Sequence, residues 1–177
     1  MKGFILAIAI ALASSTSWAC GKWRWSIKTG TDPQAQQINV NNIDHVAITD
    51  LISLPRPSYY PQNSRIEPTE SQVYNIHATI IEVRHEDDGD YHLLAQDSAG
   101  NTMITEIPDP QCAQSSVFLP LIQAARAYVD QNLPQMGRVN IPASITGVAF
   151  FDFPHAGGAA PNAIELHPVL KIRFLNQ

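Results

Sequence analysis

The sequence predicts a mainly β domain with one helix, resembling the OB-fold, a five-stranded Greek-key barrel. Two observations predict it. Segments rich in β-branched residues and separated by turn residues fill the second half of the chain. One stretch of helical periodicity interrupts them after the third segment. The order of three strands, a helix and two strands is that of the OB-fold, although a β-sandwich or another α+β arrangement gives the same string.

The first three expected strands follow one another through short connections. The first spans 73–84 (VYNIHATIIEVR) and the second spans 90–96 (DYHLLAQ), with the acidic turn 85–89 (HEDDG) between them. Turn residues at 97–101 (DSAGN) have the chemistry of a hairpin and lead into a third strand at 102–107. We therefore expect neighbouring strands here.

The periodicity changes in the last third of the chain. Apolar residues between 117 and 133 recur at helical spacing, and Ser116 is placed to cap that helix. Strand character returns at 139–152, where Gly147 suits a bulge or a sharp bend. A final strand is expected at 163–175, so the barrel as a whole spans residues 73–177.

Residues 20–72 are expected to form an irregular N-terminal segment that packs on the barrel. Asp32 is placed to cap a short helix that begins at the following proline. Trp23 and Trp25 alternate with polar residues, which favours a short strand. A further short helix is expected over 49–54, before a stretch rich in proline.

Residues 1–19 have the three parts of a secretory signal peptide: a positive start at Lys2, an apolar run over 4–13, and small residues at Ser17 and Ala19. The apolar run is too short to be a permanent membrane anchor, which needs about 20 residues. The sequence thus predicts a protein exported to the periplasm or the cell exterior.

The two cysteines, Cys20 and Cys112, predict one disulfide in an exported chain. Such a bond would close a long loop and contribute about 4 kcal/mol by the chain-entropy model. The alternative is a lipid anchor on Cys20, the first residue after the signal peptide, with Cys112 free. Lipoprotein signals usually carry Leu three residues before the cysteine, and Ser17 stands there instead.

The charge balance restricts the class of ligand. Without residues 1–19, 10 Lys and Arg face 16 Asp and Glu, a net charge of −6 with neutral histidines. An acidic protein repels phosphate backbones, which argues against general nucleic-acid binding. No second apolar segment is long enough to span a membrane.

Three pairs of an acidic residue and a histidine are candidates for a site. They are Asp90 and His92, Asp152 and His155, and Glu165 and His167. Two of the pairs have the i, i+2 spacing that places side chains on one face of a strand. In an OB-fold the turn 85–89 and the loop 153–162 lie on the same binding side, so the three pairs are expected to converge.

This expected cluster has two functional interpretations. His92, His155 and His167 with a carboxylate or water would suit a divalent metal ion such as zinc, the one cofactor that the sequence indicates. A histidine oriented by a carboxylate would suit acid–base catalysis. No H-E-x-x-H, C-x-x-C or G-x-S-x-G motif is present, and the same residues could merely satisfy the fold.

Three segments, 25–32 (WSIKTGTD), 89–112 (GDYHLLAQDSAGNTMITEIPDPQC) and 147–168 (GVAFFDFPHAGGAAPNAIELHP), resemble a family of small exported bacterial proteins. The resemblance covers most of the chain after residue 19. It implies one folded unit that includes both ends, and it implies no substrate, cofactor or catalytic residue.

Three functions follow from these observations. The favoured one is a non-catalytic ligand-binding module for a small molecule, peptide or saccharide, because the strand order is that of a binding fold and no catalytic motif is present. The second is a metal-dependent hydrolase acting on phosphodiesters, as nucleases do. The third is a structural envelope protein without a site.

Overall fold

Five long strands and one helix make up the body of the molecule in this computed structural model, which describes residues 20–154 and 157–175. The strands are β2 (Val73–His85), β3 (Tyr91–Gln96), β4 (Thr102–Ile107), β5 (Gly137–Phe151) and β6 (Ile164–Phe174), and the helix is α3 (Leu119–Asn132). The expected signal peptide at 1–19 and the candidate residue His155 lie outside the described residues.

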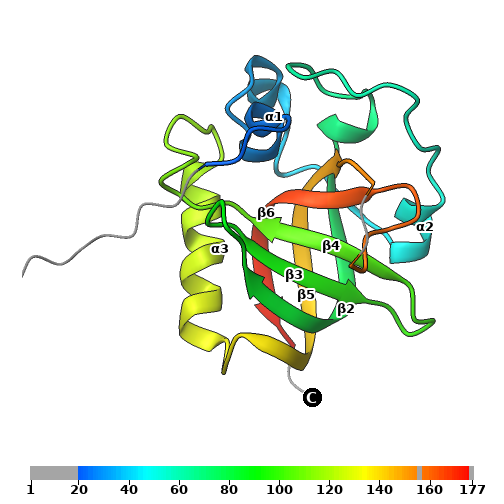
Figure 1. The fold of residues 1–177 in the computed structure, drawn as a ribbon, viewed down its shortest axis with the longest axis vertical. Helices are drawn as coiled ribbons and strands as arrows, with labels where there is room; N and C mark the ends of the chain where they lie inside the picture. Colours follow the sequence, from blue (N-terminus) through cyan, green and yellow to red (C-terminus); the bar gives the residue numbers. More distant parts are fainter. Residues whose placement is uncertain (1–19, 155–156, 176–177) are drawn as a thin grey trace, which may run out of the picture.

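The strands close into a barrel with the OB topology. β2, β3 and β4 pair antiparallel in chain order, β4 pairs parallel with β6, and β6 pairs antiparallel with β5. A long antiparallel pairing of β5 with β2 then closes the ring. Helix α3 connects β4 to β5 and packs along the barrel (Figure 1). The predicted fold class, including the helix between the third and fourth barrel strands, is confirmed.

Gly147 marks a bulge, as its position in the sequence predicted. The register between β5 and β6 shifts on both sides of Gly147. A side chain at this position would have its Cβ 2.9 Å from the carbonyl oxygen of Pro168 and 3.0 Å from the Cβ of Leu166. Only glycine allows β6 to approach β5 this closely, which bends both strands around the barrel.

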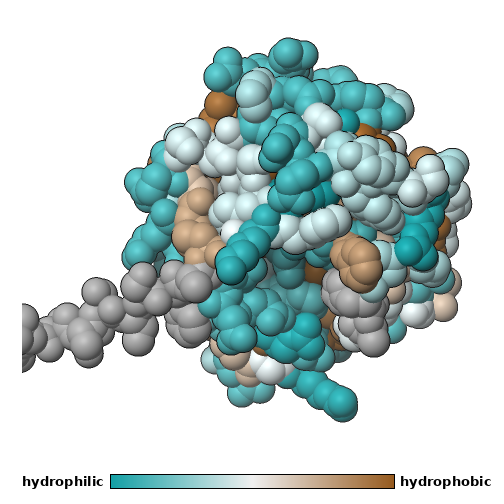
Figure 2. Space-filling model, turned by 45° about the horizontal axis from the view of Figure 1, so that its top comes forward, coloured by the Kyte–Doolittle hydropathy of each residue, from teal (hydrophilic) through white to brown (hydrophobic). Residues whose placement is uncertain are grey.

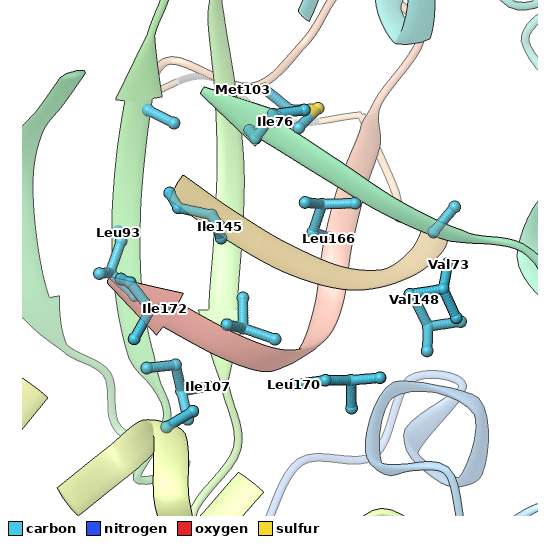
Figure 3. Close-up of a cluster of buried hydrophobic side chains, with 14 of the residues drawn as sticks. Val73, Ile76, Leu93, Met103, Ile107, Ile145, Val148, Leu166, Leu170 and Ile172 are labelled. Atoms are coloured by element: carbon cyan, nitrogen blue, oxygen red, sulfur yellow. The ribbon is translucent and has the colours of Figure 1, made fainter. Parts of the chain in front are cut away.

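The interior of the barrel is filled by aliphatic side chains from every strand (Figure 3). Alternate residues point inward, such as Leu93 on β3 and Leu166 on β6, and both are fully buried. Helix α3 adds a buried stripe of Ile122, Ala125 and Val129, which have the spacing of one helix face. Each large aliphatic side chain buried in this way contributes about 1.5–3 kcal/mol.

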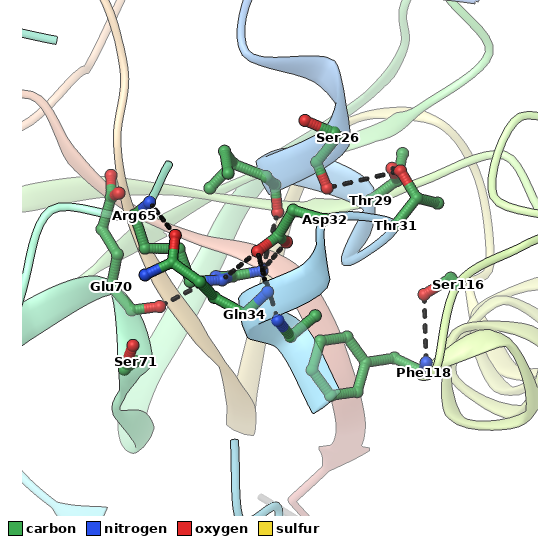
Figure 4. Close-up of polar contacts among 12 residues, drawn as sticks. Ser26, Thr29, Thr31, Asp32, Gln34, Arg65, Glu70, Ser71, Ser116 and Phe118 are labelled. Atoms are coloured by element: carbon green, nitrogen blue, oxygen red, sulfur yellow. Dashed lines mark hydrogen bonds and ion pairs between the residues drawn. The ribbon is translucent and has the colours of Figure 1, made fainter. Parts of the chain in front are cut away.

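The N-terminal segment contains several short elements. They are α1 (Trp25–Thr29), the 3₁₀ helix η1 (Pro33–Gln37), β1 (Ile43–His45), α2 (Ile48–Ile52) and the 3₁₀ helix η2 (Thr69–Ser71). β1 pairs parallel with the start of β2. Asp32 caps η1 as predicted, since its carboxylate accepts hydrogen bonds from the backbone of Gln34 and Ala35. The same carboxylate pairs with the buried Arg65 guanidinium (Figure 4).

Two local predictions were wrong. Trp25 begins the helix α1 and is not part of a strand. Tertiary contacts select the helix, because the buried Arg24 side chain fixes the start of α1 and Ile27 fills the core side. Helix α3 starts at Leu119, two residues later than expected, and its N-cap is Phe118, although the Ser116 hydroxyl still accepts a hydrogen bond from the Phe118 backbone.

Cys20 and Cys112 form the predicted disulfide, with their Cα atoms 5.5 Å apart. The bond ties the chain just before α1 to the connection between β4 and α3. A disulfide-bonded Cys20 has no thiol left to carry a lipid. Disulfides persist in oxidising compartments, in keeping with the predicted export.

No helix within residues 20–154 and 157–175 has the length and apolar character needed to cross a membrane. The face of the molecule in Figure 2 is mostly hydrophilic, with apolar residues in small separate areas.

Candidate functional site

Polar side chains gather on the outer surface of the barrel, where β3, β4 and β6 lie side by side. His92 on β3 lies opposite Glu106 on β4 in the antiparallel ladder. Glu165 lies opposite Ile104 across the parallel pairing of β4 with β6. Leu93 follows His92 and Leu166 lies between Glu165 and His167, and both leucines point into the core. Because successive residues of a strand point to opposite faces, the side chains of His92, Glu165 and His167 point outward.

Glu106 is the centre of this group. One carboxylate oxygen, Oε1, lies 2.9 Å from Nδ1 of His92, and the other, Oε2, lies 2.9 Å from Nδ1 of His167. On the other side of the His167 ring, Nε2 lies 3.3 Å from Oδ2 of Asp90. Glu165 is more distant, with its Oε2 3.9 Å from Nδ1 of His167. Glu106 thus bridges two histidines, and His167 lies between two carboxylates.

Helix α1 covers this group and adds one amine. Nζ of Lys28 lies 2.9 Å from Oδ2 of Asp152 and 3.9 Å from Oε2 of Glu106. The Phe150 ring packs beneath it, with its centre 5.3 Å from Nζ of Lys28 and 5.8 Å from the centre of the His167 ring. We call this set the acidic cluster; its members are Lys28, Asp90, His92, Glu106, Asp152, Glu165 and His167.

The acidic cluster is buried, and its hydrogen bonding is incomplete. The side chain of His167 is 0% exposed and that of Asp90 is 1% exposed. Neither ring nitrogen of His167 makes a hydrogen bond of acceptable geometry, and neither does Oδ2 of Asp90 or Nε2 of His92. A buried polar atom without such a bond costs about 1–3 kcal/mol, so several in one place indicate a site built for something besides the fold.

The pKa values of His167 and Glu106 move in opposite directions. Burial lowers the pKa of His167, but the carboxylates of Asp90, Glu106 and Glu165 outweigh burial and hold it well above its ordinary value. Burial raises the pKa of Glu106, but His167 and His92 outweigh burial and hold it well below. Without a ligand, therefore, Glu106 is an ionised carboxylate and His167 carries the compensating proton.

Lys28 and Asp90 are also perturbed. Burial lowers the pKa of Lys28, but the charges of Glu165, Glu106 and Asp152 outweigh it, and the net shift is upward. Burial raises the pKa of Asp90 and is the dominant cause, although His167 opposes it. The cluster as a whole has four carboxyl groups and only two cations, Lys28 and the protonated His167. Burial increases the cost of this charge imbalance.

A surface pocket of about 480 Å³ opens over one side of the cluster. Its lining residues are Lys28, Arg84, Glu86, Asp87, Asp88, His92 and Glu106. Four carboxylates thus face two cationic groups. Arg84 is already paired with Glu82 and Glu86, at 3.2 Å each. The pocket is therefore acidic from its rim to its floor.

Four of the candidate residues from the sequence meet directly. Asp90 and Glu165 lie next to the His167 ring, and Glu106 joins His167 to His92. Asp152 belongs to the cluster through its ion pair with Lys28. His155 lies outside the described residues, so the three-histidine metal site remains a prediction.

The sequence analysis missed two members, Glu106 and Lys28. Glu106 had a usable signal: the hairpin turn at 97–101 aligns Gln96 with Thr102, and counting back along both strands places Glu106 opposite His92. Lys28 had none, because the fold of the N-terminal segment brings it over β4 and β6.

No protein-family model and no curated protein matches this chain. Among solved structures, one match is a protein from Leishmania major Friedlin described as an aspartyl-tRNA synthetase, with 13% sequence identity and a TM-score of 0.47. The match covers 73% of this chain and 20% of the Leishmania chain, so this chain corresponds to about a fifth of that protein. The OB-like class rests on the strand pairing, and the family resemblance seen in the sequence remains a prediction.

Proposed function

We propose that this protein is an exported, non-catalytic OB-like module that binds a positively charged ligand in the acidic pocket. The observation that carries the proposal is the lining of that pocket, where Glu86, Asp87, Asp88 and Glu106 face only two cationic groups. An arrangement of this kind attracts cations and repels anions, and the effect is strong where low-dielectric walls focus the field.

Neither cationic group of the pocket is available for an anionic ligand. Arg84 pairs with two glutamates of its own neighbourhood, and Lys28 pairs with Asp152. Asp87 and Asp88 belong to the turn between β2 and β3, at the pocket's edge. An incoming cation therefore meets carboxylates at the entrance and Glu106 at the floor.

The pocket is held in shape by the elements around it. His92 and Glu106 stand on paired strands, and Lys28 stands on α1, whose start is tied by the nearby disulfide. Binding sites on such elements lose little conformational entropy when the ligand arrives. This supports a preformed site, which is typical of ligand-binding proteins.

Isothermal titration calorimetry tests the proposal. Zinc, manganese, calcium and spermidine would be titrated as cations, inorganic phosphate as an anion and a neutral trisaccharide as the uncharged probe. We expect at least one of the cations to bind, and we expect neither phosphate nor the trisaccharide to bind. The Asp87→Asn/Asp88→Asn variant should bind that cation more weakly, whereas Asp44→Asn, an exposed acid on β1, should bind it as the wild type does. Binding of phosphate or the saccharide with no binding of any cation would overturn the proposal.

A second candidate function is metal-dependent hydrolysis, and one observation favours it. Ionised Glu106 can only accept a hydrogen bond, so Nδ1 of His92 donates to it, and Nε2 of His92 is left buried without a partner. A carboxylate-oriented histidine is the arrangement of a general base. The acidic pocket disfavours anionic phosphodiesters, which places this function second. Hydrolysis of bis(p-nitrophenyl) phosphate with added zinc, lost in His92→Gln, would raise it to first.

A further inference from the structure

We infer that Asp90, Glu106 and His167 form a binding site for one divalent metal ion, with zinc as the best fit. The inference rests on the proposed function, because it names the cation that the acidic pocket admits. It differs from the metal site expected from sequence, which used three histidines.

The distances among the three side chains suit a metal ion. Each residue offers one ligand atom, and these atoms all lie within 4.8 Å of one another. Nε2 of His167 and Oδ2 of Asp90 are 3.3 Å apart. Two ligands of a tetrahedral zinc ion, each bound at about 2.0–2.1 Å, lie at about that separation. Oε2 of Glu106 faces the other ring nitrogen, Nδ1, at 2.9 Å, so the Glu106 carboxylate must move to join an ion held by Nε2 and Asp90.

The orientation of the side chains supplies an independent indication. His167 is fully buried, yet both of its ring nitrogens face carboxylate oxygens without forming an aligned hydrogen bond. Oδ1 of Asp90 accepts a hydrogen bond from the backbone of Asp109, which fixes the carboxylate and leaves Oδ2 facing His167. A metal ion that replaces the proton of His167 would satisfy these atoms, since the deprotonated ring nitrogen and the carboxylate oxygens then all offer lone pairs to it.

Neighbouring groups are placed to support the three ligands. His92 donates to Oε1 of Glu106, which orients the carboxylate and leaves Oε2 on the side of His167. Outer partners of this kind hold metal ligands in position and are a regular feature of metal sites. In each of the two carboxylates, one oxygen is thus held by a protein donor and the other is left facing His167.

The chemistry of the ligands favours zinc. Imidazole nitrogen and carboxylate oxygen are both good zinc ligands, and three protein ligands leave a fourth position for water. Magnesium and calcium prefer all-oxygen sites, so the histidine argues against them. The route of entry is the pocket, because Glu106 lines it and is 12% exposed, while Asp90 and His167 lie behind it.

The test uses the full exported chain, purified without a histidine tag and dialysed against a chelator. Zinc would be titrated by calorimetry into the wild type, Asp90→Asn, Glu106→Gln and His77→Gln, in which an exposed histidine on β2 is lost. We expect one equivalent of zinc to bind to the wild type and to His77→Gln, with the affinity about 10- to 100-fold lower or lost in the other two. Equal affinity in all four proteins, or a loss confined to His77→Gln, would overturn the inference.

X-ray absorption at the zinc edge keeps the test independent of how well the variants fold. The wild-type complex should show oxygen and nitrogen ligands with a single imidazole. Two or more imidazoles would overturn the inference. The result also separates this inference from the proposed function. Binding of spermidine without zinc would overturn the metal site and leave the cation-binding module standing, whereas binding of no cation would overturn both.

Discussion

The Arg24 guanidinium and the Glu70 carboxylate form a fully buried ion pair with two contacts, at 2.7 and 2.6 Å. Arg24 also donates to the backbone carbonyls of Pro61, Ser64 and Phe151, and Glu70 accepts from the backbone of Phe151. The pair thus joins α1, the proline-rich segment and the end of β5. Arg24 has a φ of 44°, a left-handed conformation that costs a non-glycine residue energy, and these contacts compensate for it.

We predict that Arg24→Met lowers the free energy of unfolding by about 3–5 kcal/mol, because it leaves the Glu70 charge buried without a partner. Urea denaturation followed by tryptophan fluorescence measures the loss. Arg56→Met is the matched control, since Arg56 is exposed, and it should change stability by less than about 0.5 kcal/mol. A change in Arg24→Met as small as that of the control would contradict this account of how α1 is held.

The strands of the barrel could be predicted from sequence because the residues that favour each strand and turn lie within that segment itself. The segment 73–84 is rich in β-branched residues, and the turn 97–101 has the composition of a hairpin turn, so neither depends on distant contacts. Gly147 was also recognisable, since a glycine in a strand usually marks a bulge or a close approach. The order of these elements then restricted the topology.

The acidic cluster was only partly predictable, for reasons that are not local. Asp90 and His92 could be placed on one face by alternation, and the hairpin register places Glu106 opposite His92, but β6 with His167 joins them only through its pairing with β4. Lys28 reaches the cluster because Arg24 and the disulfide hold α1 over the barrel. A five-residue helix such as α1 has little stability by itself, so tertiary contacts determine it and a local pattern cannot.

Removing the disulfide should destabilise the protein strongly. Cys20 and Cys112 are 92 positions apart, and a loop of that size stabilises the fold by about 4 kcal/mol in the chain-entropy model. We expect Cys20→Ala/Cys112→Ala to lose about 2–5 kcal/mol in urea denaturation. Dithiothreitol should weaken the wild type by a similar amount and leave the variant unchanged. If dithiothreitol also destabilised the variant, the reductant would be acting on something other than this disulfide, and the prediction would be contradicted.

A methyl group at position 147 should be poorly tolerated. In Gly147→Ala the new Cβ would lie 2.9 Å from the Pro168 carbonyl oxygen, and neither strand can yield without disturbing the barrel. We predict a loss of about 1–3 kcal/mol in the free energy of unfolding, the usual cost of overpacking. The far-ultraviolet circular dichroism spectrum should stay unchanged, because the strands persist. A stability equal to that of the wild type would mean that β5 and β6 can separate at this point.

Lys28 offers a test that separates a metal site from a merely structural ion network. Its ammonium lies 3.9 Å from Oε2 of Glu106, so it opposes any cation that approaches that oxygen. Removing the amine also leaves Oδ2 of Asp152 without its ion-pair partner. Lys28→Met should therefore make the metal-free protein less stable, by about 1–3 kcal/mol in urea denaturation.

The same substitution should raise the affinity for zinc severalfold, because the positive charge next to Glu106 is gone while Asp90, Glu106 and His167 remain. Calorimetric titration of zinc measures this, with Lys22→Met, which removes an exposed lysine just before α1, as the control of equal net charge. Zinc should also restore more stability to Lys28→Met than to the wild type, since a bound ligand stabilises the folded state in proportion to RT ln(1 + [L]/Kd). A network that serves only the fold would lose stability in Lys28→Met and gain no affinity, and that outcome would leave the metal site without support.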